Sequence, residues 1–337
     1  MPDGEGVLAS DMHIVRGPEG ISGKPGSLKW LDRKTGTVTV LYPSSSATGG
    51  KSIWGDADCT EEIGSKLLPH GFHLSRRGDG AWQLLVVNHG GRESVEFFEL
   101  TGEAGNWALN WRGCVIPPAP NRLNDVVALP GGGLLVTTMY RQAGETADDR
   151  AKLGENTGFL WRWMPDEGYS EQAGSESPRP NGVQIDADAR FAFVSTAAGG
   201  GEVRKLDLQA GRVVGSVAVP RPDNSSWTRD GRLLVTGMVP DADSGVCFAA
   251  PEKTCMVAFE VHRIDPVSME SELLFAHKGP PMGAATVAVQ HGDDLLIGTF
   301  AGDRIMAAID IFKDAPRSGE AGSFGEKPSR LPPSVNR

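Results

Sequence analysis

Two histidines, each followed by glycine, are the residues of this chain best suited to acid–base chemistry. His70 stands in the segment Pro69-His70-Gly71-Phe72, ahead of the apolar run 82–88, and His89 follows that run directly. A single histidine beside glycine is more often a turn residue, but two around one strand favour a shared function. Two imidazoles that share a proton let one of them act as a general base near neutral pH. We therefore expect His70 and His89 to be catalytic.

Side chains with amide or carboxylate oxygens recur further along the chain, each ahead of an apolar run. They are Asn124, Asp125, Asn181, Asp223 and Asn224. Any one of them alone is more often an ordinary turn residue. Two or three amides together with a carboxylate, however, form a set of hard ligands that suits calcium better than zinc or copper. The sequence therefore predicts a calcium site.

A recurring strand pattern must position these residues. In each unit a polar turn with Gly or Asp leads into an apolar run, and a second strand signal with charged turns follows. The apolar runs are 6–10, 82–88, 132–138, 190–196, 231–237 and 294–300, and the second signals are 96–100, 159–163, 203–208, 256–264 and 304–309. Short strands without sustained helical periodicity are typical of blades around an axis. We predict an all-β fold, a six-bladed β-propeller with the apolar runs as inner strands; a double β-sandwich is the alternative.

In a propeller, the loops that lead into the inner strands meet at one mouth of the central tunnel, where ligands bind. The histidines and the oxygen-bearing residues are expected there. Aromatic and methionine side chains near them are candidates for the wall of a substrate pocket, although such residues more often belong to the core. These candidates are Phe72, Met139, Tyr140, Trp227, Met238 and Phe300.

Composition and charge narrow the class of protein. The 44 glycines and 23 prolines favour many tight turns. The net charge is −10, and no basic cluster stands beside aromatic residues, so nucleic acid is not an expected partner. No apolar run is long enough to span a bilayer. We expect one domain over 1–313 and a disordered tail over 314–337, whose composition cannot bury enough surface to order it.

Targeting and cysteine signals are sparse. The chain as given shows no signal peptide, so secretion or a periplasmic location would require residues upstream of Met1. The four cysteines form no CxxC pair, and zinc is not expected. Cys247 and Cys255 could close a loop in an oxidising compartment; buried free thiols are the equal alternative. No GxSxG elbow, P-loop or dinucleotide-binding GxGxxG is present.

Several of these motifs, in this order, resemble the paraoxonase family. They are PHGF, LLVVNH with the following ESVEFFEL, LNDVVAL, PNGVQI and TVAVQHGDDLLIGT. Paraoxonases are calcium-dependent lactonases and arylesterases within the group that also holds gluconolactonases and strictosidine synthases. The resemblance runs over 4–309. It implies that His70 and His89 match a histidine dyad above the metal.

The resemblance also implies two calcium sites. Asn124, Asn181, Asp223 and Asn224 match ligands of a catalytic calcium, and Asp125 with the carbonyl of Phe72 matches a second, structural one. The implied activity is hydrolysis of lactones or aryl esters, with water deprotonated through His70 and the carbonyl polarised by calcium. Small-molecule lactones or esters are thus the expected partners.

Two departures from the family pattern bear on this reading. The family supplies a Glu-Asp pair just before the turn that residues 1–4 resemble, and this chain does not contain that pair. Met139-Tyr140 stand where the family often has acidic and imidazole groups in the wall. The alternatives are a propeller that binds a ligand or partner around a structural metal only, and a strictosidine-synthase-like condensing enzyme, which needs no metal and would not require paired histidines.

Overall fold

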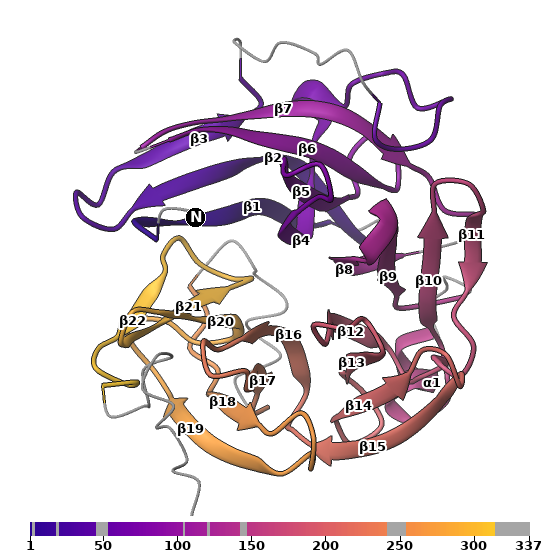
Figure 1. The fold of residues 1–337 in the computed structure, drawn as a ribbon. Coiled ribbons are helices and arrows are strands. Elements are labelled where there is room, and N and C mark those ends of the chain that lie inside the picture. Colours follow the sequence, from indigo (N-terminus) through magenta and orange to yellow (C-terminus); the bar gives the residue numbers. More distant parts are fainter. Residues whose placement is uncertain are drawn as a thin grey trace, which may run out of the picture.

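A computed structural model describes residues 1, 4–17, 20–44, 53–103, 105–119, 122–141, 147–240 and 254–313. These residues form six antiparallel sheets arranged around a common axis (Figure 1). The fold is the predicted six-bladed β-propeller. The tail expected over 314–337 lies outside the described residues, as does Cys247. No helix among the described residues is long and apolar enough to cross a membrane.

The blades follow one another along the chain. Blade 1 holds β1 (Gly6–Gly17), β2 (Gly20–Asp32) and β3 (Val38–Tyr42). Blade 2 holds β4 (Pro69–Arg76), β5 (Trp82–Asn88), β6 (Ser94–Glu103) and β7 (Asn106–Val115). Blade 3 holds β8 (Leu123–Ala128), β9 (Leu134–Thr138), β10 (Phe159–Met164) and β11 (Gly168–Glu171).

The second half of the ring continues the pattern. Blade 4 holds β12 (Pro180–Ile185), β13 (Phe191–Thr196), β14 (Glu202–Asp207) and β15 (Arg212–Ala218). Blade 5 holds β16 (Pro222–Trp227), β17 (Leu233–Met238), β18 (Phe259–Ile264) and β19 (Ser271–His277). Blade 6 holds β20 (Ala285–His291), β21 (Asp294–Thr299) and β22 (Met306–Ala308). The short helices are α1 (Ala147–Lys152), η1 (Gly64–Lys66) and η2 (Pro130–Gly132).

In blades 2 to 6 the strands that face the axis are not the ones that the sequence predicts, whereas the predicted run 6–10 does lie in β1, the inner strand of blade 1. In blades 2 to 6 the first strand is innermost, and these first strands contact one another around the ring (Figure 1). The apolar runs predicted as inner strands are the second strands β5, β9, β13, β17 and β21 instead. A second strand is covered on both faces by the neighbouring blades, so its sequence is apolar throughout; β5 is fully buried from Leu84 to Val87. The innermost strands carry the polar motifs.

Blade 1 differs from the other blades in the direction of its inner strand. β1 begins beside the β20–β21 hairpin, because Arg33, which follows β2, contacts His291 (Nη1 to Nδ1, 3.2 Å) and Asp294 (Nη2 to Oδ2, 3.0 Å). It then runs towards Pro69, at the start of β4, which lies against Gly26 of β2. β1 is therefore antiparallel to β4 and β20, and the seam between blades 1 and 6 includes these polar contacts.

A disulfide fixes the connection between blades 1 and 2. Cys59, in that connection, is bonded to Cys114 on β7, and the two Cα atoms are 5.6 Å apart. Their separation of 55 positions in the sequence gives no local signal for this pairing. Cys255 is also disulfide-bonded, which removes the alternative of a free thiol there.

Candidate functional site

A β-bulge begins the innermost strand in each of four consecutive blades. In blade 2, Pro69 pairs with Asn88 and Phe72 pairs with Val86, so β4 carries one residue more than its partner strand. The same shift of register occurs in blades 3, 4 and 5. The residues skipped by the pairing are His70 and Gly71, Asn124 and Asp125, Asn181 and Gly182, and Asp223 and Asn224. Bulges re-aim side chains beside functional sites, and here they present the predicted residues at one mouth of the tunnel.

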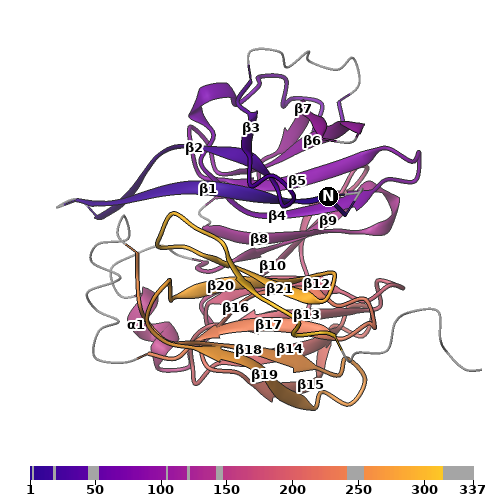
Figure 2. The same ribbon diagram turned by 90° about the vertical axis from the view of Figure 1, so that its left-hand side faces the viewer.

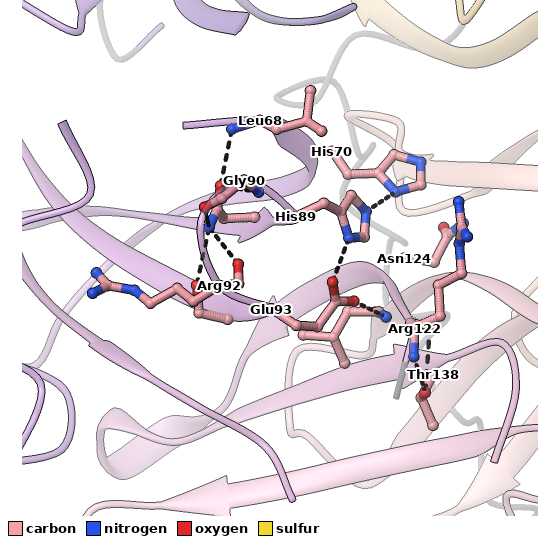
Figure 3. A network of polar contacts seen from close by, with 12 residues as sticks. Leu68, His70, His89, Gly90, Arg92, Glu93, Arg122, Asn124 and Thr138 are labelled. Carbon is pink, nitrogen blue, oxygen red and sulfur yellow. Dashed lines mark hydrogen bonds and ion pairs between the residues drawn. The ribbon is translucent and has the colours of Figure 1, made fainter. Parts of the chain in front are cut away.

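The two histidines are in hydrogen-bond contact. His70 Nδ1 lies 3.0 Å from His89 Nε2, and His89 Nδ1 lies 2.8 Å from Glu93 Oε2 (Figure 3). The other oxygen of Glu93 accepts a hydrogen bond from the backbone N–H of Leu123 at 2.6 Å. We call His70, His89 and Glu93 the histidine chain. It links the bulge of blade 2 to the start of β8 in blade 3.

The loop that carries His89 and Glu93 is held by buried polar groups. Asn88, which is fully buried, accepts hydrogen bonds from the N–H groups of Leu68 and Gly90 and donates to the carbonyl of Arg92. Gly90 is required because a Cβ there would lie 1.8 Å from the carbonyl oxygen of Lys66. The asparagine of the LLVVNH motif thus fixes the position of the histidine after it.

The hydrogen bonds around the histidine chain define its tautomers. Glu93 accepts the proton on His89 Nδ1, so His89 Nε2 accepts from His70 Nδ1, and His70 Nε2 keeps a lone pair. Burial, with the nearby His89 and Arg122, lowers the pKa of His70 to about 3. His70 is therefore neutral at physiological pH, and its Nε2 can accept a hydrogen bond. Arg122 and Asn124 lie beside it in Figure 3.

Asn124, Asn181 and Asp223, which we call the oxygen cluster, lie at the same bulge position in blades 3, 4 and 5. The buried Oδ1 atoms of Asn124 and Asn181 have no hydrogen-bond partner. Burial raises the pKa of Asp223 to about 7, against the opposing effects of two nearby arginines and a hydrogen bond from Asn181. Buried polar atoms normally have partners, so the unpaired oxygens on these two adjacent strands are candidate donors to a cation.

Asp125 and Asn224 hold the second position of their bulges. Asp125 Oδ2 accepts a hydrogen bond from the backbone N–H of Val183 in the next blade at 3.0 Å, and its pKa is raised to about 7 by burial. A Cβ on Gly71 would lie 2.5 Å from Asp125 Oδ1, so this carboxylate packs against the residue just before Phe72. The backbone of Asn224 lies against Gly182 of blade 4, where a Cβ would be 2.7 Å from the Cα of Asn224. Both residues therefore sit where adjacent innermost strands meet.

The donor set fits a calcium ion. Among the described residues no group of three or more His, Cys, Asp and Glu side chains could hold a metal. Here the donors are instead the two unpaired amide oxygens and the carboxylate of Asp223, which are hard ligands of the kind calcium prefers. The Glu-Asp pair of the paraoxonase pattern has no counterpart in this set.

The predicted wall residues fall into two groups. Met139 lies at the site, because its sulfur is 3.4 Å from Asn124 Nδ2. Tyr140 also follows β9 at this mouth and donates a hydrogen bond to Asp148 Oδ1 at 3.0 Å. The Phe72 side chain, in contrast, packs into the core between blades 1 and 2.

The remaining three wall candidates pack against other parts of the blades. Trp227 ends β16, at the far end of the tunnel; its ring packs on Phe193, and its Nε1 donates to the carbonyl of Ile185. Met238 is buried in a cluster with Cys255 and Ala284, and Phe300 packs against that cluster. Trp227 lies far from the site because a strand of six residues spans the sheet from one mouth to the other. Met238 ends β17 and Phe300 follows β21 at the site's mouth, but they pack into the hydrophobic cluster there.

Sequence reasoning missed the charged groups around the oxygen cluster. Arg179 precedes β12 and donates to Asp148 Oδ1 of α1 at 2.7 Å. Tyr140 contacts the same carboxylate oxygen. Figure 2, which views the propeller from its side, shows α1 on one face of it, at the left. A hollow of about 180 Å³ lies next to α1, lined by Arg141, Ala147, Arg150, Asn156 and Thr157. The recurrence of Arg two residues before Asn124, Asn181 and Asp223 was a signal in the sequence.

Comparison with known proteins gives no family. No family model matches the chain, and no curated protein matches it. Similar solved structures include a gluconolactonase of Xanthomonas campestris, at 17% identity over 88% of this chain and 84% of that one, with a TM-score of 0.45. Another is regucalcin, a calcium-binding protein of Agrobacterium tumefaciens, at 14% identity over 85% of this chain and 81% of that one, with a TM-score of 0.43. A third is the Cps50 (Swd1) β-propeller domain of Myceliophteria thermophila, at 12% identity over 90% of this chain and 86% of that one, with a TM-score of 0.45.

The names of these three proteins indicate no single shared activity, and none is a paraoxonase. At such low identity and TM-score they assign no activity to this chain. The resemblance to paraoxonases therefore stays a prediction from the motifs.

Proposed function

We propose that this protein is a calcium-dependent hydrolase of lactones or aryl esters. The observation that carries the proposal is the placement of the histidine chain beside the unpaired oxygens of the oxygen cluster, on neighbouring innermost strands. A general base and a group that stabilises a developing oxyanion are the two requirements of ester hydrolysis.

The histidine chain would activate the water. His70 Nε2 is the nitrogen with an available lone pair, so it takes a proton from a water molecule as that water attacks the ester carbonyl. His89 stabilises the resulting imidazolium through its hydrogen bond to His70 Nδ1, and Glu93 holds His89 in the tautomer that this requires. General base catalysis of this kind contributes about 10²- to 10⁴-fold.

The oxygen cluster would hold the cation. Asn124, Asn181 and Asp223 supply the donors at the mouth of the tunnel, and Asn224 is the further candidate ligand beside them. A bound calcium ion supplies electrostatic stabilisation of the negative charge that develops on the carbonyl oxygen. The second site proposed from the sequence would lie at Asp125 and the carbonyl of Phe72, and would have a structural role.

The experiment is a hydrolysis panel. The wild-type protein is assayed on γ- and δ-lactones and phenyl acetate, with calcium and after chelation, beside His70→Gln and Asn181→Ala. His262→Gln is the matched control, because His262 of blade 5 also contacts a carboxylate, that of Glu260, at 2.9 Å but lies outside the site. Activity lost with chelator and in both site variants, but kept in the control, supports the proposal.

Two results would contradict the proposal. Activity that survives both chelation and His70→Gln would require another mechanism. A protein that loses stability on chelation but hydrolyses nothing on the panel would be a binding propeller with a structural calcium.

A further inference from the structure

Two arginines border the oxygen cluster on the side away from the histidine chain. Arg179 and Arg221, which we call the arginine pair, stand two residues before Asn181 and Asp223, in blades 4 and 5. The corresponding residue is Leu68 in blade 2 and Ala284 in blade 6. A cationic residue at this position is therefore not a requirement of the propeller.

The backbone fixes where the arginine pair stands. Arg179 has φ 51° and Arg221 has φ 36°, both in the left-handed region that non-glycine residues rarely adopt. Their carbonyl oxygens accept hydrogen bonds from Ala197 (3.1 Å) and Met238 (3.3 Å) at the ends of the adjacent strands. Each is followed by proline in the innermost strand. The two side chains thus start from defined points on the rim of the mouth.

The arginine pair stands beside two carboxyl groups. Arg179 and Arg221 interact electrostatically with each other, and both interact with Asp148 and Asp223. The two positive charges are therefore met by at most two negative ones. A cation bound through Asp223 leaves the cluster with a net positive charge, because Asp223 can no longer compensate the arginines. An anionic ligand restores the balance.

We propose that Arg179 and Arg221 form a subsite for an oxyanion, a carboxylate or a phosphate, carried by the substrate next to the group that is hydrolysed. This inference rests on the proposed function for the placement of the reacting bond, but the binding of the anion does not depend on catalysis. Guanidinium groups bind carboxylates and phosphates through paired, charge-assisted hydrogen bonds. Anion and calcium should therefore strengthen each other's binding, since the coupling between two ligands is reciprocal.

The test is a binding measurement by titration calorimetry, with benzoate and inorganic phosphate as probes and benzamide as the uncharged control. The wild-type protein should bind at least one of the two anions, more tightly in the presence of calcium, and should not bind benzamide with similar affinity. Which anion binds identifies the chemistry of the substrate group. Arg221→Met should weaken that binding about tenfold or more.

Two further variants sharpen the test. Arg162→Met removes an arginine of blade 3 that is paired with Glu167 away from the mouth, and it should leave anion binding unchanged. Arg179→Met removes the other member of the pair, and its thermal unfolding is recorded because it also breaks the contact with Asp148. Equal anion affinity in wild type and Arg221→Met, or no anion binding to the wild type, would overturn the inference.

The outcome is separable from that of the proposed function. If the protein binds an anion through Arg221 but hydrolyses no ester, the anion subsite is supported and the hydrolase proposal is rejected. If the protein hydrolyses phenyl acetate but binds neither anion, the hydrolase proposal is supported and the anion subsite is rejected.

Discussion

Blades 2 to 5 present the candidate site residues, whereas blades 1 and 6 close the ring. Blades 2 to 5 have four strands each, and their innermost strands begin with a bulge that offers a histidine, an amide or a carboxylate to the tunnel. Blades 1 and 6 have three strands each among the described residues. β1 runs in the opposite direction, and Arg33 joins the two blades.

The difference shows how some copies of one structural repeat can carry the site residues while other copies close the ring. A bulge at a fixed register gives successive blades the same place for a functional side chain, so changing one residue type per blade builds a site. Blade 6 also has a bulge near the start of β20, where Thr286 is skipped. Thr286 therefore provides a bulge residue at the start of an innermost strand outside the proposed site.

The largest expected effect comes from replacing Asn124, with Thr286 as the control position. Asn124→Ala should lower calcium-dependent hydrolysis by about 10²-fold or more, because it removes a ligand of the ion that stabilises the oxyanion. It should also abolish most of the rise in melting temperature that calcium produces. Thr286→Ala should change neither quantity; equal losses in both variants would show that the bulges of blades 2 to 5 have no special role.

Removing the Cys59–Cys114 disulfide tests how the blade 1–blade 2 connection is held. The double variant Cys59→Ser, Cys114→Ser should lower the free energy of unfolding by about 2–5 kcal/mol, the usual cost of losing a native disulfide. Denaturant unfolding measures this, and reduced wild-type protein should be destabilised at least as much, because reduction also breaks the disulfide at Cys255. An unchanged unfolding midpoint would mean that packing alone holds the connection.

Glu93→Gln tests the third member of the histidine chain. Hydrolysis should fall by about tenfold or more, because a neutral amide orients His89 less strongly and stabilises a protonated chain less well. The stabilisation by calcium should persist, since Glu93 is not among the proposed ligands. A parallel loss of calcium response would place Glu93 in the metal site instead.

The smallest expected effect lies in the seam between blades 1 and 6. Arg33→Met should lower the free energy of unfolding by about 0.5 kcal/mol, as is usual for a partly exposed ion pair. A hydrogen bond from the backbone N–H of Asp310, together with Arg33, lowers the pKa of Asp294. The difference between variant and wild type should therefore exist at neutral pH and fade as the pH falls below about 4, where the carboxylate is protonated.

Arg162→Met is the matched control for the seam, because Arg162 pairs with Glu167 within blade 3. A loss of stability as large in this control would show that closure of the ring gains nothing from Arg33.

The sequence predicted the number of blades because each blade repeats an apolar run bounded by turns. It misassigned the inner strands of blades 2 to 6 because an apolar run reports burial on both faces, which the second strand has and the strand at the tunnel does not. The direction of β1 depends on how the ring closes, and no local pattern records that. Cys59 and Cys114 come together only when blade 2 has folded and β7 lies beside the connection from blade 1.

The candidate site was predictable where its residues repeat at one register. His70, Asn124, Asn181 and Asp223 share a motif position, and the structure places them on consecutive innermost strands. Glu93 was missed because an acidic residue in a short polar loop has no distinguishing pattern. Trp227 was expected in the wall because it is close to Asn224 in sequence, but three residues of extended strand carry it about 10 Å along the tunnel.

The most direct test of the account is a calcium titration of lactone hydrolysis and of calcium binding in the wild-type protein and in His70→Gln. We predict that both proteins bind calcium with similar affinity, while hydrolysis follows calcium occupancy in the wild type and is at least about 10²-fold slower in the variant. Hydrolysis that is independent of calcium, or as fast in His70→Gln as in the wild type, would contradict the claim that the histidine chain and the oxygen cluster form one catalytic site.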